Sequence, residues 1–456
     1  MIGFRLSEAA EVLQGRLHGR DAAFSSVSTD SRSLRVGDLF IALSGPNFDG
    51  HDYVGLAQQQ GAMGAMVQRR VETSMPLLEV EDTRIAMGEL ARAWRRKSHA
   101  RVVGVTGSNG KTTLKEMLAA ILGQRQAVLA TRGNLNNDIG MPLTLMRLQD
   151  ESYAVIEMGA NQPGEIAYLS RIAQPDVAVL NNAGRAHLEG FGSVEGVARA
   201  KAEILEGLAD DGVFVFNADD AHAALWRELA AGHRAIGFGL AEAAEVRSPR
   251  DSYRLRWVDG GFEADFQVLA GELEFELNLQ LAGEHNRMNA LAASAAALAL
   301  GVDKADIRKA LAGMPPVKGR LCPVPTASGA RLVDDSYNAN PESVAAAIAV
   351  LSIMPGRRSL VLGDLGELGT EQVALHRELG RMAADAGIER LFTLGPLSAH
   401  AGERFPGERR HFAERAELIA WLQDELSAQD SVLIKGSRSS AMDKVVSALA
   451  GEALAC

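Results

Sequence analysis

One short stretch of the chain decides the fold, and it reads Thr106-Gly107-Ser108-Asn109-Gly110-Lys111-Thr112-Thr113. The apolar run at 101–106 before it predicts a strand, and the apolar spacing of residues 112–122 predicts a helix. Backbone N–H groups in such a turn, and at the start of the helix, point at phosphate oxygens. The order of strand, glycine-rich turn and helix therefore predicts a loop that binds nucleotide phosphates.

The side chains of this loop suit ATP and a magnesium ion. Gly107 and Gly110 allow a tight backbone path, Lys111 can neutralise the outer phosphates, and the Thr112 hydroxyl can bind Mg²⁺. The common phosphate-loop pattern has a glycine where Val105 stands, but the shorter form T-G-x-N-G-K-T-T is intact. We predict that the ATP phosphates are bound by Thr106, Gly107, Ser108, Asn109, Gly110, Lys111, Thr112 and Thr113.

Outward from the loop, strands alternate with helices. Further apolar strands are expected at 153–158, 177–182 and 212–217, which predicts a parallel sheet covered by helices on both faces. Between 253 and 281 the apolar period changes to two, which predicts antiparallel hairpins at one edge of that sheet. Residues 83–313 are expected to form this central ATP-binding domain, which opens with a connecting helix.

Two further domains are expected on either side. At 456 residues the chain is long enough for about three domains. Residues 1–82 combine short apolar runs with a loop rich in Gly, Ser and Asp, and predict a small mixed α/β domain. Residues 314–456 return to strand–helix units and predict a Rossmann-like, doubly wound domain. The predicted fold class is therefore α/β with three domains.

Composition excludes some classes of protein. The net charge is −11 and there is no basic run, which argues against nucleic acid as a partner. No uninterrupted apolar run approaches the ~18 residues of a membrane span, and the N-terminus lacks an apolar signal core. We therefore expect a cytoplasmic protein. We also expect it to be a monomer.

Polar residues follow the predicted strands at the edge where ligands bind in open α/β sheets. Glu157 ends one strand and could bind Mg²⁺ or orient water, or cap the next helix. His187 follows another strand, and Lys201 lies on a helix whose charge pattern is that of a solvated face. The amide-rich segment around Asn134 and Asn137 could bind a polar substrate, or form a plain turn.

Together these segments resemble the Mur ligase family, the ATP-dependent amide-bond-forming enzymes of peptidoglycan precursor synthesis. The resemblance covers nearly the whole chain. The family's phosphate loop also lacks a glycine at the position of Val105. It implies that Lys111, Glu157, His187 and Lys201 are catalytic, and that Lys201 carries a carbamate. It also implies two Mg²⁺ ions, with ligands Thr112, Glu157, His187 and carbamylated Lys201.

The resemblance extends to the nucleotide site. The family motif H-N-x-x-N-x-x-A begins at His285, within the segment 283–290, and implies that Asn286 and Asn289 approach the adenine. Arg320 matches a family arginine near the nucleotide. In the segment D-D-S-Y-N-A-N-P, Asp335 is a candidate contact of the ribose and Tyr337 of the base.

The flanking domains resemble those of the later-acting family members, because no G-x-G-x-x-G occurs in the first 80 residues. Ser31, Arg32 and Asn47 are the candidates for uridine and pyrophosphate contacts, together with Asn134 and Asn137 for the rest of that substrate. The tetrapeptide D-N-P-R of the third-residue-adding enzyme is absent, and L-G-D-L-G-E-L-G resembles the last-acting member. The implied substrates are UDP-N-acetylmuramoyl-tripeptide and D-alanyl-D-alanine, and the candidate dipeptide contacts are Asp364, Glu367, Ser437 and Arg438.

The implied chemistry is phosphorylation of a carboxylate by ATP, followed by attack of an amine on the acyl phosphate. Related activities stay open from the sequence, namely addition of the third amino acid to a dipeptide substrate, or folate polyglutamate ligation. Two other classes also stay open: a phosphate-loop regulatory NTPase that needs no acceptor, and an inactive nucleotide-binding module.

Overall fold

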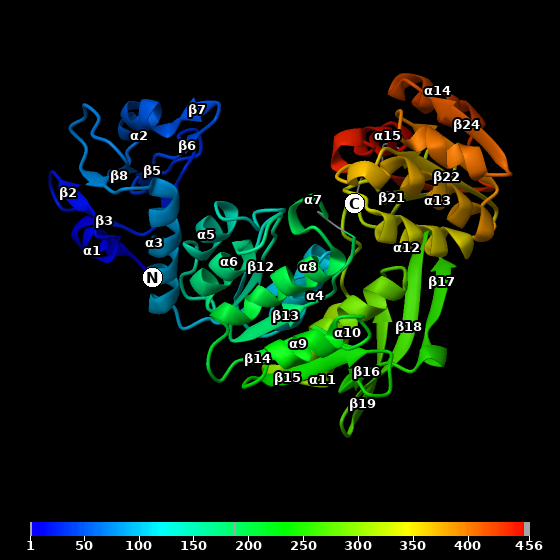
Figure 1. Ribbon diagram of the computed structural model, residues 1–456, viewed down its shortest axis with the longest axis horizontal. Coiled ribbons are helices and arrows are strands. Elements are labelled where there is room, and N and C mark those ends of the chain that lie inside the picture. Colours follow the sequence, from blue (N-terminus) through cyan, green and yellow to red (C-terminus); the bar gives the residue numbers. More distant parts are fainter. Residues whose placement is uncertain (1, 186–187, 451–456) are drawn as a thin grey trace.

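Three lobes, each built on its own sheet, make up the chain (Figure 1). The computed structural model describes residues 2–185 and 188–450. His187, a predicted metal ligand, lies outside the described residues. Within the described parts of the chain, no helix combines the length and apolar character that crossing a membrane requires.

The first lobe holds a small mixed sheet, as its sequence predicts. Its strands lie in the order β2 (Arg16–His18), β9 (Leu77–Glu79), β8 (Gly64–Val67), β5 (Leu39–Ile41) and β4 (Val27–Ser28). Helices α1 (Leu6–Val12) and α2 (Val54–Gln59) accompany it, and β6 (Ser44–Gly45) and β7 (Phe48–Asp49) form a separate hairpin.

Helix α3 (Thr83–Lys97) joins the first lobe to the second. Asp82 caps its N-terminus by accepting hydrogen bonds from Arg84 N at 2.7 Å and Ile85 N at 3.1 Å. Trp94 is fully buried, and its ring centroid lies 5.6 Å from that of Phe4 in the first lobe. Its Nε1 donates to the carbonyl oxygen of Leu148 in the second lobe at 2.9 Å. One apolar core therefore spans both lobes.

The second lobe is a ten-stranded sheet. Its order is β11 (Val128–Ala130), β12 (Tyr153–Glu157), β10 (Arg101–Thr106), β13 (Val177–Leu180), β14 (Val213–Asn217), β15 (Arg234–Gly239), β16 (Val246–Arg247), β18 (Gly261–Ala270) and β17 (Arg254–Val258), with β19 (Leu273–Leu279) also on β18. Strands β11 to β16 are parallel, and the hairpins β17–β18 and β18–β19 are antiparallel, as predicted.

Helices α4 (Lys111–Leu122) and α10 (Glu284–Ala299) pack on one face of this sheet, and α6 (Glu165–Ala173) and α8 (Val194–Ala202) lie on the other. In the parallel register, Val105 of β10 pairs with Glu157 of β12, and Thr106 pairs with Leu180 of β13. The phosphate loop, Glu157 and the residues that follow β13 therefore meet at one edge.

The third lobe is a six-stranded sheet in the order β20 (Cys322–Val324), β21 (Arg331–Asp335), β25 (Asp430–Lys435), β22 (Arg357–Gly363), β23 (Arg390–Leu394) and β24 (Glu408–Phe412). All pairs except β20–β21 are parallel, and the helices are α12 (Pro341–Ser352), α13 (Gln372–Asp385), α14 (Arg415–Glu425) and α15 (Asp443–Leu449). The β17–β18 hairpin reaches this lobe (Figure 1), where Phe262 joins its apolar core.

The shared core predicts that Trp94 is a main stabilising residue. Trp94→Ala should lower the free energy of unfolding by about 3 to 5 kcal/mol, because it empties a buried site and leaves the Leu148 carbonyl without its donor. Urea denaturation followed by circular dichroism measures this change. Phe48→Ala, at an aromatic ring that is 57% exposed, should change stability by less than about 1 kcal/mol. Equal effects of the two substitutions would contradict the shared core.

Candidate active site

The phosphate loop rests closely on side chains beneath it. Gly110, just before α4, has a φ of 79°, and a Cβ there would lie 2.5 Å from Asn289 Oδ1 and 2.6 Å from Asn181 Nδ2. Any other residue would strain the backbone and also collide with these amides. The glycine that ends the motif is therefore required by close approach as well as by conformation.

A layer of asparagines holds the loop from below. Asn181 Nδ2 donates to the Asn109 carbonyl at 3.0 Å and to Asn289 Oδ1 at 2.8 Å. Asn182 Oδ1 accepts from Asn109 N at 2.8 Å. Asn289 in turn donates to Asn286 Oδ1 at 3.1 Å, and Asn286 is also buried. The pair expected at the adenine thus lines the cavity but is largely engaged in supporting the loop.

Asn181 and Asn182 were missed as site residues by sequence reasoning. The signal that could have found them is their position directly after β13, at the ligand edge of the sheet. Two other contributors, Asn136 and Asn340, lie in segments that the sequence analysis singled out, but not among its candidate residues.

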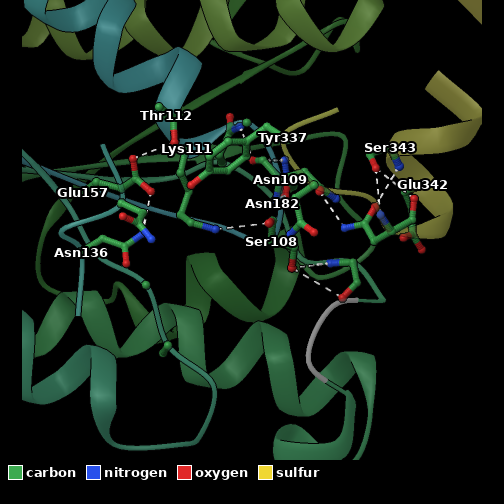
Figure 2. Close-up of a pocket in the computed structure, with 18 of the residues that line it drawn as sticks. Ser108, Asn109, Lys111, Thr112, Asn136, Glu157, Asn182, Tyr337, Glu342 and Ser343 are labelled. Atoms are coloured by element: carbon green, nitrogen blue, oxygen red, sulfur yellow. Dashed lines mark hydrogen bonds between the residues drawn. The ribbon is translucent and has the colours of Figure 1, made fainter. Parts of the chain in front are cut away.

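Lys111, Thr112 and Glu157 converge at the start of α4 (Figure 2). Lys111 Nζ donates to the carbonyls of Gly107 at 2.7 Å and Ser108 at 3.2 Å, so the ammonium lies over the loop. Burial lowers the pKa of Lys111, and Glu157 opposes that shift.

Glu157 is 2% exposed and uses both carboxylate oxygens. Thr112 Oγ1 donates to Oε2 at 3.0 Å, and Asn136 Nδ2 donates to Oε1 at 2.8 Å. A hydroxyl and a carboxylate at this separation are oxygen ligands of the kind that Mg²⁺ takes beside a phosphate. Among the described residues no three His, Cys, Asp or Glu side chains group as a metal site. The Thr112 hydroxyl and the Glu157 carboxylate are hard oxygen donors, so these two residues fit magnesium.

Lys201 is a buried residue of α8. It is 2% exposed, donates to the Ala160 carbonyl at 3.2 Å, and lies 5.2 Å from the centre of the Phe191 ring. Burial, aided by repulsion from Lys111, lowers the pKa of Lys201 to about 7. Lys201 itself does not line the cavity, but Ala160 does.

A cavity of about 1370 Å³ lies beside the loop. It is lined by Arg84 and Ile85 of α3 and by residues of the second and third lobes. Across it the third lobe contacts the loop directly. Arg320 Nη2 donates to Thr112 Oγ1 at 2.9 Å, and Asn340 Nδ2 donates to Asn109 Oδ1 at 2.7 Å.

A second contact across the cavity is an ion pair. Arg185 Nε lies 2.7 Å from Glu342 Oε1, at the first turn of α12. Arg320 also lies over the Tyr337 ring, 4.5 Å from its centre. Arg320 and Tyr337, both predicted at the nucleotide, are thus brought to the phosphate loop.

Asp335 lines the cavity as expected, but its carboxylate is already paired. Lys435 Nζ lies 2.5 Å from its Oδ2, and Leu321 N donates to its Oδ1 at 3.1 Å. Lys435, which sequence reasoning missed, therefore neutralises the predicted ribose contact.

The candidate dipeptide residues divide into two groups. Glu367, Ser437 and Arg438 line the cavity. Asp364 does not, because its Oδ1 accepts hydrogen bonds from Leu397 N at 3.0 Å and Ser398 N at 2.7 Å. Its carboxylate holds the turn after β23. A carboxylate that follows a strand can either hold a turn or bind a ligand, and its position in the sequence does not distinguish the two.

The residues predicted to contact the UDP substrate also fall into two groups, those that line the cavity and those that do not. Asn134 and Asn137 line the cavity, although Asn137 Oδ1 also accepts from Gly140 N, at the start of α5 (Gly140–Leu145), at 2.9 Å. The other three, Ser31, Arg32 and Asn47, lie in the first lobe and do not line it.

Three family models match the chain: the Mur ligase family catalytic domain over residues 23–95, the Mur ligase middle domain over 105–297, and the Mur ligase glutamate ligase domain over 319–438. The chain belongs to the Mur ligase family, and the resemblance predicted from its sequence is confirmed.

Within the family, the chain is similar to one particular enzyme. UDP-N-acetylmuramoyl-tripeptide–D-alanyl-D-alanine ligase of Escherichia coli (strain K12) is 44% identical over 98% of this chain and 99% of its own length. A crystal structure of MurF from Acinetobacter baumannii has a TM-score of 0.91 and 36% identity, covering 98% of this chain and 99% of that chain. MurF ligase from Thermotoga maritima in complex with ADP has a TM-score of 0.83 and 30% identity, covering 93% of this chain and 96% of that chain.

The asparagine layer predicts that Gly110 is needed for nucleotide binding. Gly110→Ala should raise the Kd for ATP by roughly tenfold or more, because the added methyl group must displace Asn289 and Asn181. Isothermal titration calorimetry measures the Kd. Gly301→Ala is the matched control, because Gly301 has a φ of 80° but nothing within 4 Å of its Cβ position. Unchanged ATP affinity in Gly110→Ala would show that the asparagine layer does not determine the conformation of the phosphate loop.

Proposed function

We propose that the chain is an ATP-dependent peptide ligase that joins D-alanyl-D-alanine to UDP-N-acetylmuramoyl-tripeptide. The full-length similarity to ligases of that name supports the substrates. The observation that carries the proposal is the convergence of Lys111, Glu157 and the third lobe's Arg320 on one cavity. A phosphate loop and an acceptor-binding lobe on the same cavity are what a two-step ligase needs.

The first step forms an acyl phosphate. A carboxylate oxygen of the tripeptide attacks the γ-phosphorus of ATP, the bond to the β–γ bridging oxygen breaks, and ADP leaves. Both reactants are anions, so cationic groups must offset their repulsion. Lys111 is placed over the loop for this role, and Arg320 approaches from the opposite wall.

The second step forms the amide. The neutral amine of D-alanyl-D-alanine attacks the acyl carbon, phosphate leaves, and the nitrogen loses a proton. Glu367, Ser437 and Arg438 are the proposed dipeptide contacts, and a guanidinium suits the dipeptide carboxylate. Contact of the third lobe with the phosphate loop keeps the acyl phosphate away from bulk water.

Magnesium ions are part of the proposal. Thr112 and Glu157 would hold one ion, and His187 with Lys201 as a carbamate would hold another. Bound there, Mg²⁺ would neutralise charge that develops on the transferred phosphoryl group. The lowered pKa supports the carbamate, because a neutral amine is the form that combines with CO₂.

The remaining assignments follow from the same proposal. Residues 1–82 bind the UDP end of the substrate through Ser31, Arg32 and Asn47, residues 83–313 bind ATP, and residues 314–456 bind the dipeptide. Asn286, Asp335 and Tyr337 contact the nucleoside from the cavity wall. We propose that the enzyme acts as a monomer in the cytoplasm.

The direct test measures phosphate release with magnesium, ATP and UDP-N-acetylmuramoyl-tripeptide. Release should require D-alanyl-D-alanine, and mass spectrometry should find the pentapeptide product. Lys111→Ala should lose at least about 99% of the rate while keeping its circular dichroism spectrum, since it removes the phosphate-facing charge. Release at the full rate without any acceptor would indicate an NTPase. Preference for a single amino acid and a dipeptide-linked nucleotide would indicate the third-residue-adding activity.

Lys201 gives an independent test of the carbamate. Lys201→Ala should lower the rate by about 100-fold or more, and short carboxylates such as acetate or formate should restore part of it by filling the emptied space with an anion. The matched control is Lys115→Ala, which removes a lysine that is 1% exposed but donates to the Thr131 carbonyl at 2.7 Å. Carboxylates should not rescue that variant. Rescue of both or of neither would contradict the carbamate.

A further inference from the structure

One end of the cavity carries a charged pair that the proposed steps do not use. Arg84 on α3 and Asp138 in the loop before α5 both line it and form an ion pair through Arg84 Nε. Their side chains are 58% and 31% exposed. An exposed pair of this kind contributes little to stability, so a ligand can separate it at small cost.

The same end also has an apolar wall. Ile85 follows Arg84 on α3, lines the cavity, and is 59% exposed. Tyr168 on α6 lines it too, and burial, with the negative charge of Asp138, raises the pKa of its phenol to about 12. The phenol therefore stays neutral at physiological pH. This end of the cavity therefore combines two charged side chains with an apolar wall. Such a site suits a ligand with a chain of methylene groups that ends in charged groups.

Both charged residues are fixed in place by their elements. Arg84 lies in the first turn of α3, whose cap is Asp82. Asp138 follows Asn137, whose Oδ1 accepts from Gly140 N at the start of α5. Tyr168 lies so close to α3 that a Cβ at Gly88 would be 2.1 Å from its hydroxyl oxygen. The site is thus built on rigid segments rather than on mobile side chains alone.

The pair lies close to the reacting groups. Asn136, which donates to Glu157 Oε1 at 2.8 Å, precedes Asp138 by two residues. Two residues of extended chain span at most about 7 Å. Asp138 therefore lies in the same short segment as a residue that contacts Glu157, and both Asp138 and Glu157 line the cavity.

This inference rests on the proposed function. We propose that the Arg84–Asp138 end of the cavity binds the side chain of the tripeptide's third residue, and that it selects a side chain ending in both an ammonium and a carboxylate. Arg84 takes the distal carboxylate, Asp138 takes the distal ammonium, and Ile85 and Tyr168 cover the methylenes. 2,6-Diaminopimelate has such a side chain, and the name of one similar Acinetobacter baumannii ligase contains this residue.

The selectivity follows from counting charges. A zwitterionic terminus separates the pair but gives each partner a new counter-ion. A lysyl side chain brings only the ammonium, so Asp138 gains a partner and Arg84 loses one. The zwitterionic side chain therefore makes two new ion pairs for the one that it separates, and the lysyl side chain makes only one, so the diaminopimelyl substrate binds more tightly.

The test compares two nucleotide-linked tripeptides, one ending in 2,6-diaminopimelate and the other in lysine. Wild-type enzyme should have the lower KM for the diaminopimelyl substrate. Arg84→Ala should raise that KM by about tenfold or more, the loss typical of one charge-assisted hydrogen bond. It should not raise the lysyl KM, because the lysyl ammonium then no longer competes with Arg84 for Asp138. Asp138→Asn should raise both values, because both side chains carry the ammonium. The KM for ATP should stay unchanged in each variant.

Arg171→Ala is the matched control, because Arg171 pairs with Glu206 on the same lobe with its side chain 62% exposed, and it does not line the cavity. It should change neither KM. Thermal denaturation should show all three variants folded. An Arg84→Ala effect of equal size on both substrates, or no effect on either, would overturn the assignment. Failure of the proposed function would be visible separately, as absence of acceptor-dependent phosphate release by the wild-type enzyme with both tripeptides.

Discussion

The close contact between the phosphate loop and the asparagines below it is the constraint on which the site depends. Gly110 can take its left-handed conformation, and lie against Asn289 and Asn181, only because it has no side chain. That contact fixes where α4 begins, and hence where Lys111 and Thr112 project. It also links three separate parts of the chain, because the amides come from the end of β13 and from α10. The loop's shape is therefore a tertiary property, although its sequence is local.

The cavity arises from two different kinds of contact between lobes. The first and second lobes share one apolar core through α3 and Trp94. The third lobe contacts the loop through hydrogen bonds and an ion pair, Arg320–Thr112, Asn340–Asn109 and Arg185–Glu342, with Phe262 as an apolar contact at the side. Polar contacts exchange readily with water or ligand, whereas an apolar core does not. Any opening of the cavity is therefore expected at the third lobe.

Sequence periodicity predicted the sheet types, the hairpin edge and the position of the phosphate loop, because these depend on local spacing of apolar residues and on turn glycines. Glu157 was also predictable, since strand ends meet at one edge of a parallel sheet. The residues that contact these groups could not be predicted in the same way. Asn181, Asn136 and Lys435 act through contacts between residues distant in sequence. Asp364 shows the converse, because a carboxylate after a strand can bind a ligand or hold a turn, and here it holds a turn.

The shared core of the first two lobes has a consequence for substrate length. Because Trp94 packs against Phe4 and donates to the Leu148 carbonyl, side-chain packing sets the separation between the first lobe, proposed above to bind UDP, and the phosphate loop. A substrate whose nucleotide end is bound at the first lobe must then span a fixed distance to reach the phosphate loop. Only a peptide of the matching number of residues brings its terminal carboxylate to the γ-phosphate, so the scaffold itself counts residues before any side chain is recognised.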